Sequence, residues 1–176
     1  MIPALGINFN ETSYLSAKTR IRDWLLSGES RSVFAANVHM LMVAQDSPNF
    51  KQILNRADMI TPDGMPLVWM LRLKGFPDQQ RVYGPTLMLH VLEMAAHDNI
   101  RVGFYGGDQA TLEKLGQGLT RRFPALNVVY SFSPPYRALD DQESARIAAE
   151  ITDSGARILL VGLGCPKQEV WIDQQR

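Results

Sequence analysis

The sequence predicts an α/β fold in which a mostly parallel sheet carries helices on both faces. Short apolar runs such as residues 157–161 alternate with stretches whose apolar residues recur at helical spacing, as Phe50, Ile53, Leu54 and Ala57 do. Runs that are apolar throughout are typical of strands buried on both faces of the sheet, as in parallel sheets. A length of 176 residues suits one domain. We therefore expect a single Rossmann-like domain.

Cap and turn residues divide the chain into the expected elements. Ser47 is expected to cap one helix, and Asp108 and either Asp140 or Asp141 to cap two others. The helix that follows Pro66 is apolar on nearly all sides and is expected to be interior. The expected strands are 5–9, 32–36, 57–60, 100–105, 128–132 and 157–161, and the expected helices begin near residues 13, 40, 47, 66, 85, 108, 140 and 166.

Composition excludes several classes of protein. The 18 basic and 18 acidic residues cancel, which argues against a nucleic-acid binder held by a broad positive field. A single cysteine, Cys165, excludes an internal disulfide and is compatible with a reducing compartment. No apolar run approaches the roughly 18 residues of a membrane span, so we expect a soluble chain that can still act at a membrane surface. The histidines show no metal-ligand spacing, and no metal site is expected.

A short polar junction at residues 61–69 separates two apolar stretches. Pro62 ends the preceding strand, Gly64 permits a turn, and Pro66 suits the first turn of a helix. Asp63 therefore lies where an apolar strand gives way to an apolar helix, a position that suits a catalytic carboxylate. The same pattern fits an aspartate that caps the helix or shapes the turn. Spacing alone leaves both interpretations open.

Ligands of parallel α/β sheets bind outside the carboxyl ends of the strands. That rule selects Asn37, Asp63, segment 106–108 and segment 162–168 as residues that could share one rim. Four polar segments meeting at one rim are less typical of four independent caps. This convergence strengthens the functional interpretation of Asp63 without excluding the cap.

Glycines in two of these segments predict contacts with phosphate groups. Glycine lets the backbone approach a ligand, and the N–H groups at a helix start attract phosphate, to which Lys167 would add charge. Neither segment matches the glycine spacing of the dinucleotide-binding or Walker motifs. The candidates for diphosphate or nucleotide contacts are Gly106, Gly107, Asp108, Gly162, Gly164 and Lys167.

Cys165 and the final helix raise two further expectations. A thiol near a helix start could act as a nucleophile, but no histidine can be paired with Cys165 from sequence, which favours a packed thiol. The helix that starts at Pro166 has little length before the sequence stops, although Val170, Trp171 and Ile172 need cover. We therefore expect a truncated chain, and an exposed apolar patch that would favour homo-oligomers.

Four motifs in order resemble those of the WecG/TagA/CpsF glycosyltransferase family, also called glycosyltransferase family 26. Residues 35–37 read Ala-Ala-Asn, and residues 61–66 read Thr-Pro-Asp-Gly-Met-Pro. Residues 81–84 read Arg-Val-Tyr-Gly, and residues 162–169 read Gly-Leu-Gly-Cys-Pro-Lys-Gln-Glu. Each motif alone is weak, but together they span nearly the whole chain.

The resemblance implies an inverting transfer of a sugar from a UDP-sugar to a polyprenyl-diphosphate-linked acceptor sugar, in cell-surface polysaccharide synthesis. The family's donors include UDP-linked N-acetylmannosamine, its uronic acid, and glucose, and neither a metal nor a cofactor is required. By resemblance, Asp63 is the general base, and Asn37, Arg81 and Gln168 bind substrate. The implied location is cytoplasmic, peripheral to the inner face of the plasma membrane.

The chain departs from many relatives at three places. Ala35 stands where many have Thr, and Thr86 where many have Asp, which bears on sugar preference. Relatives usually continue with a basic segment linked to membrane association. We therefore expect residues 1–176 to be one catalytic domain without that segment, weakly active or inactive, and poor at binding membranes.

Two other classes of function stay open from sequence. A nucleotide-binding oxidoreductase would suit the sheet, but it should bind a nicotinamide cofactor and the glycine spacing is wrong for one. A catalytically silent partner-binding module would suit the final helix and the zero net charge. It should bind no nucleotide sugar in calorimetry.

Overall fold

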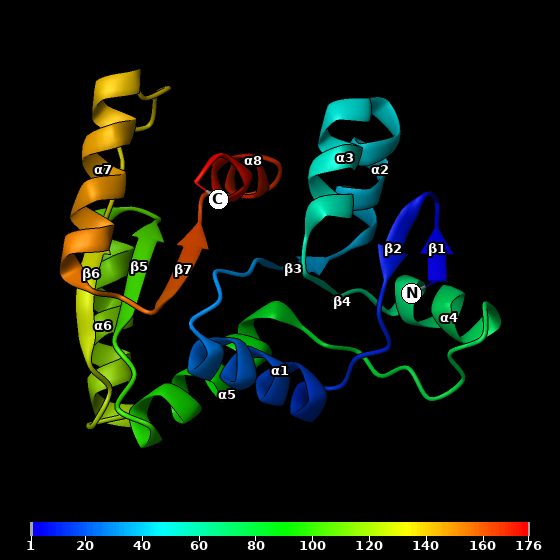
Figure 1. Cartoon of the computed structure of the whole chain (residues 1–176), viewed down its shortest axis with the longest axis horizontal. Helices are drawn as coiled ribbons and strands as arrows, with labels where there is room; N and C mark the ends of the chain where they lie inside the picture. Colours follow the sequence, from blue (N-terminus) through cyan, green and yellow to red (C-terminus); the bar gives the residue numbers. More distant parts are fainter. Residues whose placement is uncertain (1, 176) are drawn as a thin grey trace. The chain divides into compact units, whose positions relative to one another are not determined.

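A computed structural model describes residues 2–175, except for the side chain of residue 2, and divides into two compact units. The first unit holds the chain up to His90 together with Cys165–Gln174, and the second holds Val91–Gly164. Both units combine helices with parallel strands (Figure 1). The predicted α/β, mostly parallel, Rossmann-like class is confirmed. That the two units act as one catalytic domain stays a prediction.

The strands of the first unit form two pairs. β3 (Val33–Ala36) runs parallel to β4 (Met59–Pro62), and β1 (Ile2–Ala4) pairs antiparallel with β2 (Ile7–Phe9). The expected strand over residues 5–9 is confirmed at Ile7–Phe9 and wrong at residues 5 and 6. Leu5 and Gly6 have φ values of 52° and 76°, so the chain turns there and forms a hairpin.

Several helices of the first unit begin at polar caps close to the expected positions. Ser47 caps α3 (Pro48–Arg56) by accepting the N–H of Phe50, as predicted, and Ser13 forms a capping box at the start of α1 (Tyr14–Ser27). The helices of this unit are α1 (Tyr14–Ser27), α2 (Val38–Asp46), α3 (Pro48–Arg56), α4 (Met65–Leu73) and α8 (Lys167–Gln174), with the start of α5 (Gly84–His97).

The helix α4 is less buried than its sequence predicts. Leu67, Val68 and Leu71 are buried, but Trp69 is 57% and Leu73 is 89% exposed. One face of α4 packs on the unit, where it contacts β1 and β4, and the opposite face meets solvent. The expectation of an interior helix is therefore wrong, because a helix that is apolar on all sides does not reveal which face is covered.

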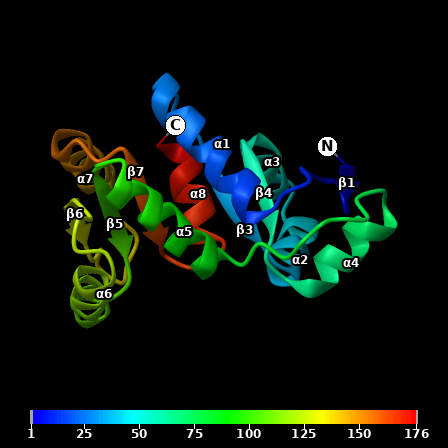
Figure 2. The same ribbon diagram turned by 90° about the horizontal axis from the view of Figure 1, so that it is seen from below.

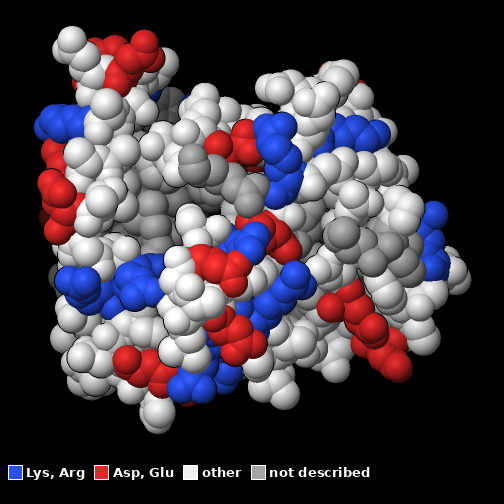
Figure 3. All heavy atoms as spheres, in the orientation of Figure 1, with Lys and Arg blue, Asp and Glu red and all other residues white. Residues whose placement is uncertain are grey.

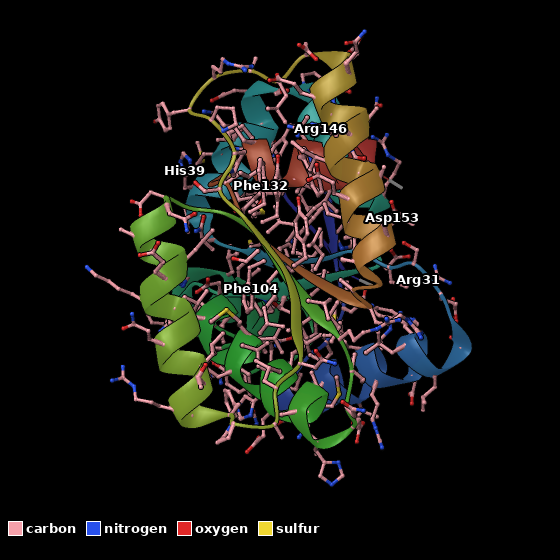
Figure 4. The ribbon with its side chains drawn as sticks, turned by 90° about the vertical axis from the view of Figure 1, so that its left-hand side faces the viewer. Arg31, His39, Phe104, Phe132, Arg146 and Asp153 are labelled. Atoms are coloured by element: carbon pink, nitrogen blue, oxygen red, sulfur yellow. The ribbon has the colours of Figure 1, made fainter. Side chains whose placement is uncertain are left out.

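The second unit is a parallel three-stranded sheet between helices. β5 (Val102–Gly106) lies between β6 (Val128–Phe132) and β7 (Ile158–Gly162), and all five of its residues are buried. α6 (Gln109–Arg122) and α7 (Asp141–Ser154) cover opposite faces of this sheet (Figures 2 and 4). Asp108 caps α6 as predicted, and Asp140, rather than its neighbour, caps α7.

Charge is evenly distributed over the visible surface. On the face drawn in Figure 3, basic and acidic side chains are interspersed and neither sign dominates, in agreement with the net charge of zero. Within residues 2–175, every helix is too short or too polar to cross a bilayer.

Candidate active site

Asp63 sits immediately after β4, where two main-chain groups fix its position. Its own N–H donates to the carbonyl of Ala36 over 2.8 Å, which extends the β3–β4 pairing by one residue. Its carboxylate accepts from Arg81 Nη2 at 3.3 Å through Oδ1 and from the N–H of Gly84 at 3.4 Å through Oδ2. The Asp63 side chain is 17% exposed, so its oxygens are held in place and still reach the surface.

The structure decides against Asp63 as the cap of the helix that follows it. The N-cap of α4 is Gly64, which makes no side-chain cap hydrogen bond. The two contacts of the Asp63 carboxylate are long for hydrogen bonds, and a carboxylate has about four lone-pair sites. The Asp63 carboxylate therefore retains capacity to accept further hydrogen bonds.

Arg81 holds both the backbone and the side chain of Asp63. Its Nε donates to the Asp63 carbonyl and its Nη2 to the carboxylate, while its guanidinium lies 4.6 Å from the ring centre of Tyr83. Its side chain is 46% exposed. An arginine has five N–H donors, so Arg81 can position Asp63 and also bind an anionic group.

Asn37 lies beside the same turn and has a structural task. Its Oδ1 accepts the N–H of Met40 at 3.0 Å, which makes Asn37 the N-cap of α2. A Cβ placed on Gly64 would be 3.9 Å from the Cβ of Asn37, so the two residues are neighbours. The cap uses the Asn37 oxygen, and Asn37 is exposed.

A close approach at Gly84 brings segment 81–84 against segments 35–37 and 61–66. A Cβ on Gly84 would lie 3.1 Å from the Cβ of Ala35 and 3.7 Å from Asp63 Oδ2. Glycine is the residue that fits there without displacing a neighbour. Segments 35–37, 61–66 and 81–84 therefore meet in the first unit, and they bring together Asn37, Asp63 and Arg81.

Gln168 belongs to the first unit as well, on the first turn of α8. The helix is fixed to α3 by Arg56, which forms a two-pronged ion pair with Asp173 at 2.9 and 2.6 Å. The Gln168 amide donates to Glu169 Oε1 at 2.7 Å. Glu169 is buried although it carries a carboxyl group, and sequence analysis missed it because an acid in a first helical turn is normally solvated.

The glycine segment after β5 is shaped by backbone packing. Gly106 has a φ of 118°, and a Cβ there would lie 2.4 Å from the carbonyl oxygen of Gly162. The N–H of Gly107 donates to that same oxygen at 3.1 Å. Asp108 Oδ1 accepts the N–H of Thr111 at 2.6 Å, and this hydrogen bond lowers the pKa of Asp108. These residues thus have structural tasks.

The predicted phosphate contacts divide between the units. Lys167 lies in the first unit, and the second unit holds Gly106, Gly107, Asp108, Gly162 and Gly164. A rim shared by these glycines and Asp63 stays a prediction. A cavity of about 180 Å³ in the second unit is lined by residues of α6, β5 and β6 and of the segment 123–126, and by none of the predicted site residues.

Cys165 has the environment of a packed thiol. It lies against the apolar core of the first unit, and burial, together with the nearby Glu169, raises the pKa of its thiol to about 12. A reactive cysteine needs a lowered pKa, so the structure supports packing over nucleophilic attack. Within residues 2–175, no group of three or more His, Cys, Asp and Glu side chains could hold a metal ion.

Fold and site together define a Rossmann-like α/β protein with an accessible acid at the end of a parallel strand, held by an arginine. Comparison with known proteins identifies the family. The chain belongs to the glycosyl transferase WecG/TagA/CpsF family, whose model matches residues 2–176.

Two bacterial relatives carry the same functional name. The chain is 30% identical over 144 residues to the N-acetylglucosaminyldiphosphoundecaprenol N-acetyl-beta-D-mannosaminyltransferase of Bacillus spizizenii (strain W23), with 82% of the chain and 54% of that protein aligned. It is 25% identical over 173 residues to the protein of that name from Staphylococcus aureus (strain NCTC 8325), with 97% of the chain and 66% of that protein aligned. The chain therefore spans between half and two thirds of the length of these relatives.

Proposed function

We propose that this chain is the part of an inverting glycosyltransferase that carries the general base. Asp63 takes the proton of an acceptor hydroxyl as that oxygen attacks the anomeric carbon of a UDP-sugar, and UDP leaves from the opposite face. Proton transfer to a positioned carboxylate typically contributes about 10²- to 10⁴-fold in rate. The observation that carries the proposal is the Asp63 carboxylate itself, 17% exposed and held by Arg81 instead of capping α4.

The relatives' names indicate which sugars to test. Both name an N-acetylmannosaminyl group that is transferred to N-acetylglucosaminyldiphosphoundecaprenol. We infer that the donor here is UDP-N-acetylmannosamine, ahead of its uronic acid and UDP-glucose, and that the acceptor is a sugar on a polyprenyl diphosphate. Arg81, Asn37 and Gln168 bind substrate, and Arg81 stabilises negative charge without a metal ion. Such an acceptor would place the enzyme at the inner face of the plasma membrane.

The test is a transfer assay in the full-length enzyme with each of the three UDP-sugars and a lipid-linked N-acetylglucosamine acceptor. We expect UDP release and a lipid-linked disaccharide with UDP-N-acetylmannosamine, unchanged by a metal chelator. Binding of UDP in calorimetry would separate the transferase from a silent partner-binding module. Binding of NADH without UDP-sugar turnover would instead favour an oxidoreductase and end the transferase proposal.

A further inference from the structure

Glu169 is an ionisable side chain in a place where ionisable groups are rare. It lies in the first turn of α8 with 1% of its surface exposed, and burial raises the pKa of its carboxyl. A buried carboxyl is costly to fold unless its oxygens are well paired, and an apolar residue of similar size is often as stable or more so. A role in stability therefore does not explain Glu169.

The side-chain hydrogen bond of Glu169 is made with its neighbour Gln168. Oε1 accepts from Gln168 Nε2 at 2.7 Å, whereas Oε2 has no hydrogen-bond partner among the described residues. Burial, together with the nearby Glu169, raises the pKa of the Cys165 thiol. All three residues belong to the first unit, which also holds Asp63.

Consecutive residues on a helix project about 100° apart, so a side-chain bond between them restricts both. Because Glu169 Oε1 accepts the N–H of the Gln168 side-chain amide, that amide turns its nitrogen toward Glu169. The Gln168 carbonyl oxygen then points elsewhere. One buried oxygen in this way decides which end of the amide is presented.

We propose that Glu169 is a positioning residue, which holds the Gln168 amide in one orientation for contact with the sugar substrate. The inference rests on the proposed function, in which Gln168 binds substrate. Glu169 does not touch the substrate and acts through Gln168.

Nuclear magnetic resonance tests the positioning step without any turnover. The Gln168 side-chain amide signals of the full-length protein are assigned by their loss in Gln168→Ala. We expect Glu169→Leu to speed exchange of these amide protons on the order of tenfold, the loss of about one hydrogen bond. Glu169→Gln keeps an acceptor oxygen at the same place and should preserve the protected signals. Unchanged exchange in Glu169→Leu would overturn the proposal.

Two controls separate positioning from general disturbance of α8. Cys165→Ala removes the thiol next to Glu169, and Asp173→Asn breaks the ion pair at the other end of the helix. Both should leave the Gln168 amide protected. Should Glu169→Leu fail to fold, Glu169→Asp withdraws the carboxyl by one methylene and should also release the amide. A protected amide in folded Glu169→Asp would count against the proposal.

Kinetics then test whether the orientation matters for transfer. Glu169→Leu should raise KM about as much as Gln168→Ala, and the double variant should be no worse than Gln168→Ala alone, because both changes remove the same contact. Glu169→Gln should restore the wild-type KM. Additive effects in the double variant, or a released amide with normal kinetics, would overturn the positioning role. If the wild-type enzyme showed no transferase activity, the proposed function would be refuted, whereas the result for the Gln168 amide would still stand.

Discussion

Asp63 and Asp108 occupy matching places in the two units, yet their carboxylates have different partners. Each follows the end of a buried parallel strand and precedes a helix. Asp108 is the N-cap of α6, whereas Gly64 takes that position before α4 and Asp63 stands one residue earlier. A shift of one residue relative to the first helical turn therefore separates an acid that caps its helix from one that accepts from Arg81 and Gly84 instead.

Of the two aspartates, substitution of Asp63 is expected to have the largest effect on transfer. Asp63→Asn keeps the shape of the side chain but removes the base, so we expect kcat to fall by about 10²- to 10⁴-fold. Asp140→Asn is the matched control, because Asp140 caps α7 outside the predicted site and asparagine caps helices as well as aspartate, so its rate should match the wild type. Initial rates of lipid-linked product formation measure both. Full activity of a folded Asp63→Asn enzyme would falsify the base assignment.

The next largest effect is on stability and concerns Gly106, which precedes Asp108. Gly106→Ala places a Cβ against the Gly162 carbonyl at a positive φ, and we expect it to lower the free energy of unfolding by on the order of 3 kcal/mol. Gly116 lies within α6, where an added Cβ would meet no atom within 4 Å, so Gly116→Ala should stabilise by about 0.5–1 kcal/mol. Urea denaturation measures both. Equal stabilities would show that the loop after β5 does not need its glycine.

Removal of Arg81 should have an intermediate effect on transfer. Arg81→Ala loses the two contacts to Asp63, and we expect kcat/KM to fall roughly tenfold. Arg81→Lys should recover only part of this loss, because lysine lacks the planar fork. Arg137 forms a similar ion pair with Glu143 at the start of α7, and Arg137→Ala should leave kcat/KM unchanged. Equal losses at both arginines would point to a general charge effect.

The smallest effect is the pH dependence of the Asp108 cap. Its pKa is lowered in the folded state, chiefly by the Thr111 N–H, so its stabilising contribution is present above the ordinary carboxyl range. The contribution is lost as the pH falls through the lowered pKa. Asp108→Ala should therefore lower Tm slightly at neutral pH and match the wild type in strong acid, measured by circular dichroism. A difference that persists in acid would contradict the charged cap.

Local sequence patterns were sufficient to predict most helices and strands. They were insufficient where the structure depends on packing between distant segments. Ser47, Asp108 and the strand over residues 128–132 could be predicted because caps and apolar runs act within a few residues. The exposed face of α4 and the hairpin turn at Gly6 could not, since they depend on which surfaces meet.

The same limit applies to the site. Asp63 and Asn37 were selected by their places at the carboxyl ends of strands, Arg81 was found through the resemblance, and the structure links Asp63 to Arg81 directly. Sequence spacing could not distinguish the roles of Asp63 and Asp108, because their positions relative to the N-cap of the following helix differ by only one residue. Glu169 carried no signal, because burial of a first-turn acid depends on packing between segments far apart in sequence.

The contact between Ala35 and Gly84 restricts how this neighbourhood can evolve. A Cβ at position 84 would press on the Ala35 methyl group and make an ordinary contact with Asp63 Oδ2, so a side chain there would require Ala35 to shift. Position 35 carries alanine, the smallest chiral side chain, and is the position of the two where a larger side chain can be introduced. A lineage that enlarged it would alter the room beside the acid while leaving the acid itself untouched.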